Sequence, residues 1–359
     1  MKDKQFLYDY LNAFSPVGLE TEGQSIWITE MSKYGFITEY PYGTAVSEYK
    51  GSTTGKVIAI EAHCDEIAWI ITNIDNDGYI RVKRSGGSDS IIAASKTGII
   101  HTHNGEKIKG LFGSPAIHTR DRAKDSVPKD EDLWFDVGVS TKDAVNKLGI
   151  EVGNLITFDD QFQEIGDYYV GRSLDNKIGG YILSEVFRRL SENNIELPFT
   201  LLAINSVQEE VGLHGAKLIA KRIPIDLALV HDVCHNTNHP KMDKNKDCDV
   251  NGGNGFCVEY TAQNHKTIIK KIRELADSSS IKYQVIVGSY GNDTMGFFLE
   301  NIPTAIIATP LKYMHTTVEM AHKDDVESVI QMYLKFIEFL SSNMYWLNEF
   351  EQKYYDLKN

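Results

Sequence analysis

One stretch of the sequence joins a strand-like run, a turn with two carboxylates and a helix-like run. Residues 199–204 are apolar, and the helix-like residues 214–220 follow shortly after Gly212. Between the two runs, Glu209 and Glu210 lie where the predicted strand ends. A strand, a loop and a helix form the repeating unit of α/β proteins, and such loops commonly carry binding and catalytic residues. Taken alone, two adjacent glutamates more often form an exposed acidic turn.

The same alternation of strand-like and helix-like runs extends over much of the chain. Residues 56–62 are almost continuously apolar, which is typical of a central strand buried on both faces. After residue 171, strand-like and helix-like runs alternate up to a closing helix predicted at 323–343. We therefore predict an α/β fold in which a mostly parallel sheet is sandwiched by helices.

A β-rich segment interrupts this alternation. Between residues 67 and 167, short β-rich runs are separated by turns of Gly, Asn and Asp. Many short strands at this spacing predict a small barrel or sandwich, and a chain of 359 residues is long enough for two domains. We expect a discontinuous catalytic domain formed by residues 1–66 and 168–359, with an inserted β-rich domain at 67–167.

Composition limits the class of partner and the compartment. The net charge of −13 argues against nucleic acid and against anionic membranes as partners. The sequence has no run of about eighteen apolar residues and no secretory start, so we expect no membrane span and no export. Its four cysteines form no CxxC pair, and we interpret them as free thiols of a cytoplasmic protein.

Histidine and carboxylate side chains occur where several predicted elements begin or end. Each has an ordinary structural alternative: Asp175 would serve as a helix N-cap, and His63 and His315 as hydrogen-bonded structural histidines. The carboxyl ends of parallel strands meet at one edge of a sheet, however, and ligands bind there. We therefore expect one cluster from these side chains, which in chain order are His63, Asp65, Asp175, Glu209, Glu210, Asp232 and His315.

This set of side chains suits two divalent metal ions. Imidazole and carboxylate ligands favour zinc, cobalt or manganese, and a carboxylate can bridge two ions about 3.5–4 Å apart. Such ions lower the pKa of a shared water and polarise a carbonyl, and a free carboxylate takes the proton and returns it to the leaving amine. Two histidines, two aspartates and one glutamate would supply the ligands. A second glutamate would be the base, and Asp65 would orient His63.

Together, the motifs resemble the dinuclear metallo-aminopeptidases of the glutamyl aminopeptidase family, which includes tetrahedral aminopeptidases and proteins named endoglucanase M. The resemblance covers nearly the whole chain, and the motifs in this order are highly specific. The motifs are His63-x-Asp65-Glu66-Ile67, Leu174-Asp175-Asn176-Lys177, Gln208-Glu209-Glu210-Val211-Gly212, Asp232-Val233 and Tyr313-Met314-His315-x-x-x-Glu319.

The resemblance implies a role for each metal ligand. Asp175 would bridge two divalent ions. His63 and Asp232 would complete one metal site, and Glu210 and His315 would complete the other. Zinc or cobalt is the metal that we expect, with manganese as a further candidate.

The resemblance also implies an activity and an assembly. Glu209 would be the general base for a metal-activated water, and Asp65 would support His63. The enzyme would release N-terminal amino acids from short peptides. The implied fold is that of the phosphorylase/hydrolase-like zinc peptidases, with a PDZ-like or barrel-like insertion that limits access and contributes to oligomer contacts. A homo-oligomer, such as a tetrahedral dodecamer, is expected.

The sequence departs from the family pattern in three places. Ala68-Trp69 stands where the family usually has a glycine, and Gly291-Asn292-Asp293 stands in a segment that shapes the substrate pocket. The preferred N-terminal residue therefore stays open. Three histidines lie near the predicted metal ligand Asp232 in the sequence, namely His231, His235 and His239. Three interpretations are open for them: extra ligands, pH-sensitive neighbours or solvent-facing loop residues. We favour the last.

Three other functions compete with an aminopeptidase. One is a different dinuclear amide hydrolase, such as a deacylase or a carboxypeptidase-like enzyme, and another is a non-catalytic metal-binding assembly protein. The third is a glycanase, but glycoside hydrolysis normally needs two carboxylates beside the sugar and has no use for the other predicted ligands. The presence of all predicted ligands and a base favours the aminopeptidase.

Overall fold

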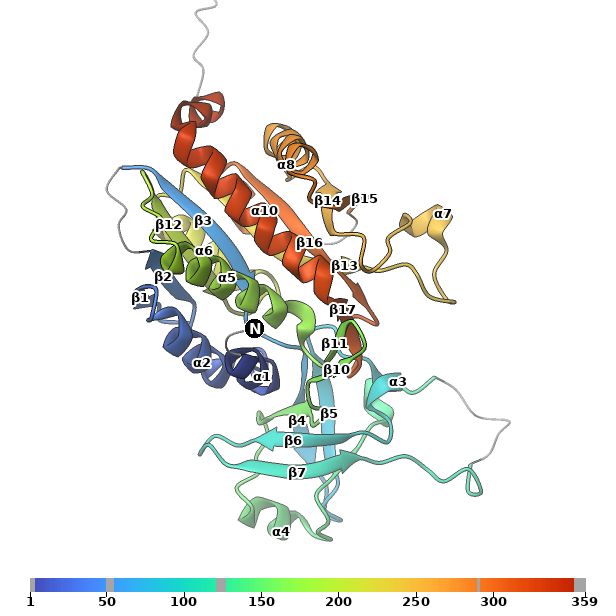
Figure 1. The fold of residues 1–359 in the computed structure, drawn as a ribbon. Coiled ribbons are helices and arrows are strands. Elements are labelled where there is room, and N and C mark those ends of the chain that lie inside the picture. The colour runs from blue at the N-terminus through green and yellow to red at the C-terminus, as the bar shows by residue number, and fades with distance from the viewer. Residues whose placement is uncertain (1–3, 50–54, 121–126, 289–290, 352–359) are drawn as a thin grey trace, which may run out of the picture.

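The computed structural model of the chain describes residues 4–49, 55–120, 127–288 and 291–351. A large mixed sheet lies between helices, and a small closed barrel lies at one end of it (Figure 1). The predicted α/β class with a β-rich, barrel-like insertion is therefore confirmed. None of the helices in these ranges is both long enough and apolar enough to cross a membrane.

Eleven strands within the described ranges form the large sheet. Along its main path the order is β1-β2-β12-β3-β13-β16-β17-β11-β10, and β14 pairs with both β15 and β16. The strands are β1 (Gly35–Glu39), β2 (Ala45–Tyr49), β3 (Val57–His63), β10 (Gln163–Ile165), β11 (Tyr168–Gly171), β12 (Thr200–Ser206), β13 (Leu227–His235), β14 (Phe256–Tyr260), β15 (Tyr283–Val287), β16 (Thr304–Lys312) and β17 (Glu319–His322).

The four central strands, β12, β3, β13 and β16, run parallel to one another. Their carboxyl ends therefore lie along one edge of the sheet, where α/β proteins bind their ligands. Two of these strands, β13 and β16, stay paired with each other as far as His235 and Leu311.

Alternate side chains of the central strands pack into different cores, as the period of a strand requires. In β3, Ile58 and Ile60 belong to one core and Ala59 to the other. Side chains of five helices complete the first core: α1 (Lys4–Asn12), α2 (Thr21–Met31), α5 (Leu174–Glu192), α8 (Lys266–Ser279) and α10 (Lys323–Ser342). The second core is completed by α6 (His214–Arg222) and α9 (Thr294–Leu299).

The barrel closes in the order β4-β5-β8-β7-β6-β9. Its core is aromatic: the rings of Phe112 and Phe135 meet edge to face with centroids 4.9 Å apart, and Trp69 is fully buried beside them. Its strands are β4 (Ala68–Ile74), β5 (Ile80–Ser85), β6 (Thr97–His101), β7 (Lys107–Phe112), β8 (Phe135–Asp136) and β9 (Leu155–Phe158). The short helices of the chain are α3 (Ser90–Ala93), α4 (Lys142–Lys147) and α7 (Lys244–Asp247), with 3-10 turns at Asp130–Asp132 and Met344–Phe350.

All six barrel strands fall inside the predicted insertion at 67–167. Strand β10 also falls inside that range, but it pairs with β11 in the large sheet. The chain therefore leaves the sheet after β3 and returns to it through β10 and β11.

Candidate metal centre and active site

The carboxyl edge of the central strands gathers the predicted site residues. His63 is the last residue of β3, Asp175 lies in the first turn of α5, and Asp232 lies within β13. The loops after β12 and β16 supply the remaining side chains. The residues that meet at this edge are His63, Asp175, Glu209, Glu210, Asp232 and His315.

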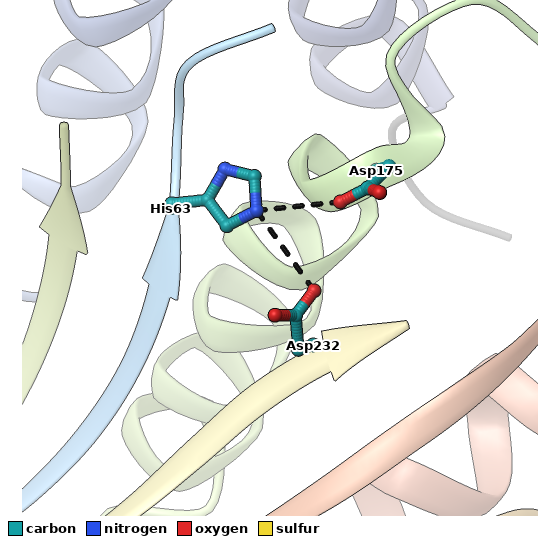
Figure 2. A group of neighbouring side chains, drawn as sticks. All are labelled: His63, Asp175 and Asp232. Carbon is teal, nitrogen blue, oxygen red and sulfur yellow. Dashed lines mark ion pairs between the residues drawn. The ribbon is translucent and has the colours of Figure 1, made fainter. Parts of the chain in front are cut away.

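Three of these side chains form a buried group (Figure 2). The Nε2 atom of His63 lies 3.3 Å from Oδ1 of Asp175 and 3.8 Å from Oδ1 of Asp232. The three side chains come from β3, α5 and β13, and they point toward a common centre.

A second group shares Asp175 with the first. The Nε2 atom of His315 lies 3.4 Å from Oδ2 of Asp175 and 3.3 Å from Oε1 of Glu210. The two oxygens of Asp175 therefore face two different histidines, Oδ1 toward His63 and Oδ2 toward His315.

The donor atoms of each group are suitably spaced for a metal ion. Within each group, the potential ligand atoms all lie within 4.8 Å of one another. Ligand atoms that are about 2.0–2.1 Å from a tetrahedral zinc ion are about 3.3 Å apart, which is close to several of the distances here. Imidazole nitrogens and carboxylate oxygens are also the ligands that zinc, cobalt and manganese accept. The residues present therefore fit the metal ions that the sequence predicts.

Opposite charges hold the cluster together electrostatically. Burial alone would lower the pKa of His315, but its contacts with Asp175 and Glu210 outweigh burial and raise that pKa to about 12. Burial would raise the pKa of Asp175, but His315 and His63 hold it below its usual value. Because a histidine must be neutral to bind a metal, metal binding at these groups would release protons.

Glu209 lies beside the first group and belongs to neither group. Its Oε2 atom is 3.9 Å from Nε2 of His63. Burial raises the pKa of Glu209 well above its usual value, and His63 offsets this only in part. A carboxylate whose pKa is raised in this way is a stronger base than an exposed one, so Glu209 is suited to accept a proton.

Asp65 fixes the loop that carries both glutamates. The backbone N–H groups of Glu209 and Glu210 donate to its two carboxylate oxygens, over 3.0 and 3.1 Å. The Nδ1 atom of His63 lies 3.2 Å from the carbonyl oxygen of Asp65 and 3.5 Å from Oδ1 of its side chain. One buried carboxylate therefore contacts both the first metal group and the glutamate pair.

Glu319 is a site residue to which the sequence reasoning gave no role. It lies in β17 with its carboxylate buried, and it accepts backbone hydrogen bonds from His315 over 2.7 Å and from Asp175 over 3.2 Å. It therefore links a residue of the second metal group to the shared Asp175. The available signal was its place four residues after His315 in the last motif.

The expectation that His231, His235 and His239 are solvent-facing loop residues is wrong for the first two. Both lie within β13, because that strand stays paired with β16 as far as His235. His231 is buried between Asn176 and Thr309, with contacts of 2.7 and 2.8 Å.

The surroundings of His231 and His239 determine the protonation of the first and the packing of the second. Burial lowers the pKa of His231 to about 3, so it is neutral. His239 is half-buried in the loop beyond the strand, where its ring packs against Tyr313. None of the three belongs to the metal groups found among the described residues.

A cavity of about 830 Å³ opens beside the metal groups. Asp175, Glu209, Glu210, Asp232 and His315 line it, and this volume lies within the range of ordinary ligand sites. The departures from the family pattern lie in different places. Asn292 and Gly291 line the cavity, Asp293 is buried and accepts a hydrogen bond from Ser206, and Trp69 lies in the barrel core.

The loop after β5 brings the barrel segment to the second metal group. Gly87 lines the cavity, and a Cβ atom at this position would lie 2.3 Å from Nδ1 of His315. Only glycine fits so close to the imidazole ring, because real Cβ atoms essentially never approach another heavy atom to less than 3.0 Å.

We expect Gly87→Ala to displace His315 and to lower both metal occupancy and kcat/KM by at least tenfold, by analogy with the loss of groups that orient metal ligands. Metal analysis and peptide hydrolysis measure the two effects. Gly55→Ala is the matched control, since no atom lies within 4 Å of a Cβ at Gly55. Equal activity of both variants would contradict the inferred contact.

Several known proteins are similar to this chain in sequence or in fold. The lysyl aminopeptidase of Pyrococcus furiosus is 29% identical over 312 residues, covering 83% of this chain and 85% of that protein. A solved aminopeptidase of Desulfurococcus kamchatkensis superposes with a TM-score of 0.90 at 26% identity, covering 98% and 99% of the two chains. The TET1 peptidase of Pyrococcus horikoshii superposes with a TM-score of 0.84 at 25% identity, covering 93% and 98%.

The family model described as M42 glutamyl aminopeptidase matches residues 43–332. This range includes both metal groups, the glutamate pair and all six barrel strands. The resemblance found in the sequence is therefore confirmed, and the chain belongs to the M42 glutamyl aminopeptidase family.

Proposed function

We propose that this metal-dependent aminopeptidase holds two divalent ions, with Asp175 as the ligand that both share. His63 and Asp232 complete one set of ligands, and Glu210 and His315 complete the other. The observation that carries the proposal is the position of the Asp175 carboxylate, whose two oxygens face His63 and His315 separately. A carboxylate in that position can bridge two ions.

Glu209 is the general base in this proposal. When bound, the ions would lower the pKa of a water molecule and polarise the scissile carbonyl. Glu209 takes the proton from that water as the water oxygen forms a bond to the carbonyl carbon. It then delivers the proton to the leaving amine nitrogen as the peptide C–N bond breaks. Asp65 and Glu319 accept backbone hydrogen bonds from the base and from three of the ligands, and these bonds fix the positions of those residues. The residues are Glu209, Glu210, Asp175 and His315.

Zinc or cobalt is the proposed metal, with manganese as a further candidate, because the ligands are imidazole and carboxylate groups. Short peptides are the proposed substrates, because a cavity of about 830 Å³ has room for a few residues. We place the enzyme in the cytoplasm, since its four cysteines are free.

We also propose that residues 67–167 form a domain that limits access and contributes to assembly. The approach of Gly87 to His315 supports the first role. The second is supported by the TET1 peptidase of Pyrococcus horikoshii, which can assemble into a tetrahedron or a large octahedral shell. A homo-oligomer, such as a tetrahedral dodecamer, is the expected assembly.

Hydrolysis of three related peptides tests the proposed function. The enzyme should release the first residue of a free tripeptide and of its C-terminally amidated form. It should not cut the N-acetylated form. Chromatography of the products identifies the bond that is broken. Deacetylation of the blocked peptide, or release of the C-terminal residue from the free peptide, would instead favour the deacylase or the carboxypeptidase-like alternative.

A further inference from the structure

Glu259 is a buried acid in the wall of the cavity that the proposed mechanism does not use. It lies in β14, is only 5% exposed, and lines the same cavity as the metal groups. No hydrogen bond or ion pair from the described residues reaches its carboxylate. Burial raises the pKa of Glu259 to about 7. An unpaired acid in this position is costly when charged, and a cation beside it would relieve that cost.

The sheet places Glu259 within reach of the reacting centre. Ala308 of β16 pairs with Asp232 of β13 on one side and with Cys257 of β14 on the other. Asp232 and Cys257 are therefore two strand spacings, or roughly 10 Å, apart. Glu259 follows Cys257 by two residues, so the two side chains lie on the same face of β14. These two residues of β14 add about 7 Å along the strand, so Glu259 lies roughly 12 Å from Asp232. A long substrate side chain that starts at the metal groups and the side chain of Glu259 can together span this distance, and both Asp232 and Glu259 line the same cavity.

The wall around Glu259 is apolar. Ile286 pairs with Glu259 across β14 and β15, and both residues line the cavity together with Cys234 and Cys248. An apolar wall that contains a buried acid suits a side chain that has an aliphatic stem and a cationic head. Lysine and arginine have this form.

The other charges of the cavity do not neutralise Glu259. Among the described lining residues, Lys246 is the sole lysine or arginine, and its side chain is 80% exposed on α7. The bound ions would neutralise the acids of the metal groups, and no cationic side chain of the described residues pairs with Glu259. A substrate with an acidic first residue would bring a second negative charge against it, which is unfavourable.

We propose that Glu259 selects peptides whose first residue is lysine or arginine, by pairing with the cationic head of that side chain. This inference rests on the proposed aminopeptidase function, since it assigns a specificity to that site. The family description refers to a glutamyl aminopeptidase, whereas one relative, from Pyrococcus furiosus, is a lysyl aminopeptidase, so neither description alone assigns the first residue for this chain. Glu259 is a specificity residue here and takes no part in bond breaking.

The test uses lysyl, arginyl, leucyl and glutamyl p-nitroanilides with the full-length, metal-loaded enzyme. The wild type should give kcat/KM values at least tenfold higher for lysyl and arginyl than for leucyl substrates, with glutamyl the lowest. In Glu259→Gln the lysyl-to-leucyl ratio should fall by about thirtyfold or more, because a buried charge loses its partner. Both rates come from one preparation, so a partial loss of folded enzyme cancels in the ratio.

Asp249→Asn is the matched control, because Asp249 is an exposed acid that follows Cys248 and does not line the cavity. Its lysyl-to-leucyl ratio should equal that of the wild type. A wild type that prefers leucyl or glutamyl substrates, or a ratio unchanged in Glu259→Gln, would overturn the specificity and leave the aminopeptidase intact. Failure to hydrolyse any of the four substrates would instead count against the proposed function itself.

Discussion

Glu209→Gln is expected to lower kcat by about 10²–10⁴-fold while the enzyme keeps the metal content of the wild type. The glutamine has nearly the shape of the glutamate but cannot take a proton from water at neutral pH. Glu209 belongs to neither group of candidate metal ligands, so its replacement should leave both groups complete. Initial rates on an aminoacyl nitroanilide and elemental analysis of the same preparation measure the two quantities.

The adjacent residue provides the sharpest comparison. Glu210 has the same chemistry but lies 3.3 Å from His315 within the second group, so Glu210→Gln should lose metal as well as activity. Glu151→Gln controls for the substitution itself, since Glu151 is exposed and far from the site in sequence. If Glu209→Gln loses metal while Glu210→Gln keeps it, the two roles are reversed.

Asp175→Asn is expected to weaken metal binding in both groups and to abolish measurable turnover. The amide removes the negative charge and offers one oxygen where the carboxylate offers two. Loss of residues that merely orient a ligand costs about 10–100-fold in metal affinity, so loss of the shared ligand should cost at least that much in each group. Competition with a chromogenic chelator measures the affinity.

Wild-type enzyme treated with a strong chelator should be as inactive as Asp175→Asn. Added zinc, cobalt or manganese should then restore the activity of the wild type and not that of the variant. Asp143→Asn, an exposed aspartate of α4, should behave as the wild type does in both assays. Full activity of Asp175→Asn after chelation would contradict a metal-dependent mechanism at this position. Loss of only one ion in this variant would contradict the sharing of Asp175.

Much of the site follows from the sequence because it depends on where strands end. Apolar runs such as 56–62 predict buried strands, and parallel strands bring their carboxyl ends to one edge. His63 and His315 therefore lie together although they are 252 positions apart in the sequence. The proximity of these residues thus depends on the order of the strands rather than on any local pattern.

The sequence was less informative where contacts between distant segments decide the environment. The length of β13 depends on its pairing with β16, which placed His231 in a buried strand instead of a loop. The hydrogen bond from the backbone N–H of Asp175 to Glu319 and the approach of Gly87 to His315 join segments far apart in the chain. No local periodicity reports such contacts.

The central claim is that two ions bind on either side of Asp175, and anomalous diffraction at the metal absorption edge tests it most directly. We predict two peaks, one among His63, Asp175 and Asp232 and one among Asp175, Glu210 and His315, with Glu209 bound to neither. A single peak, or a peak with Glu209 as a direct ligand, would contradict this account.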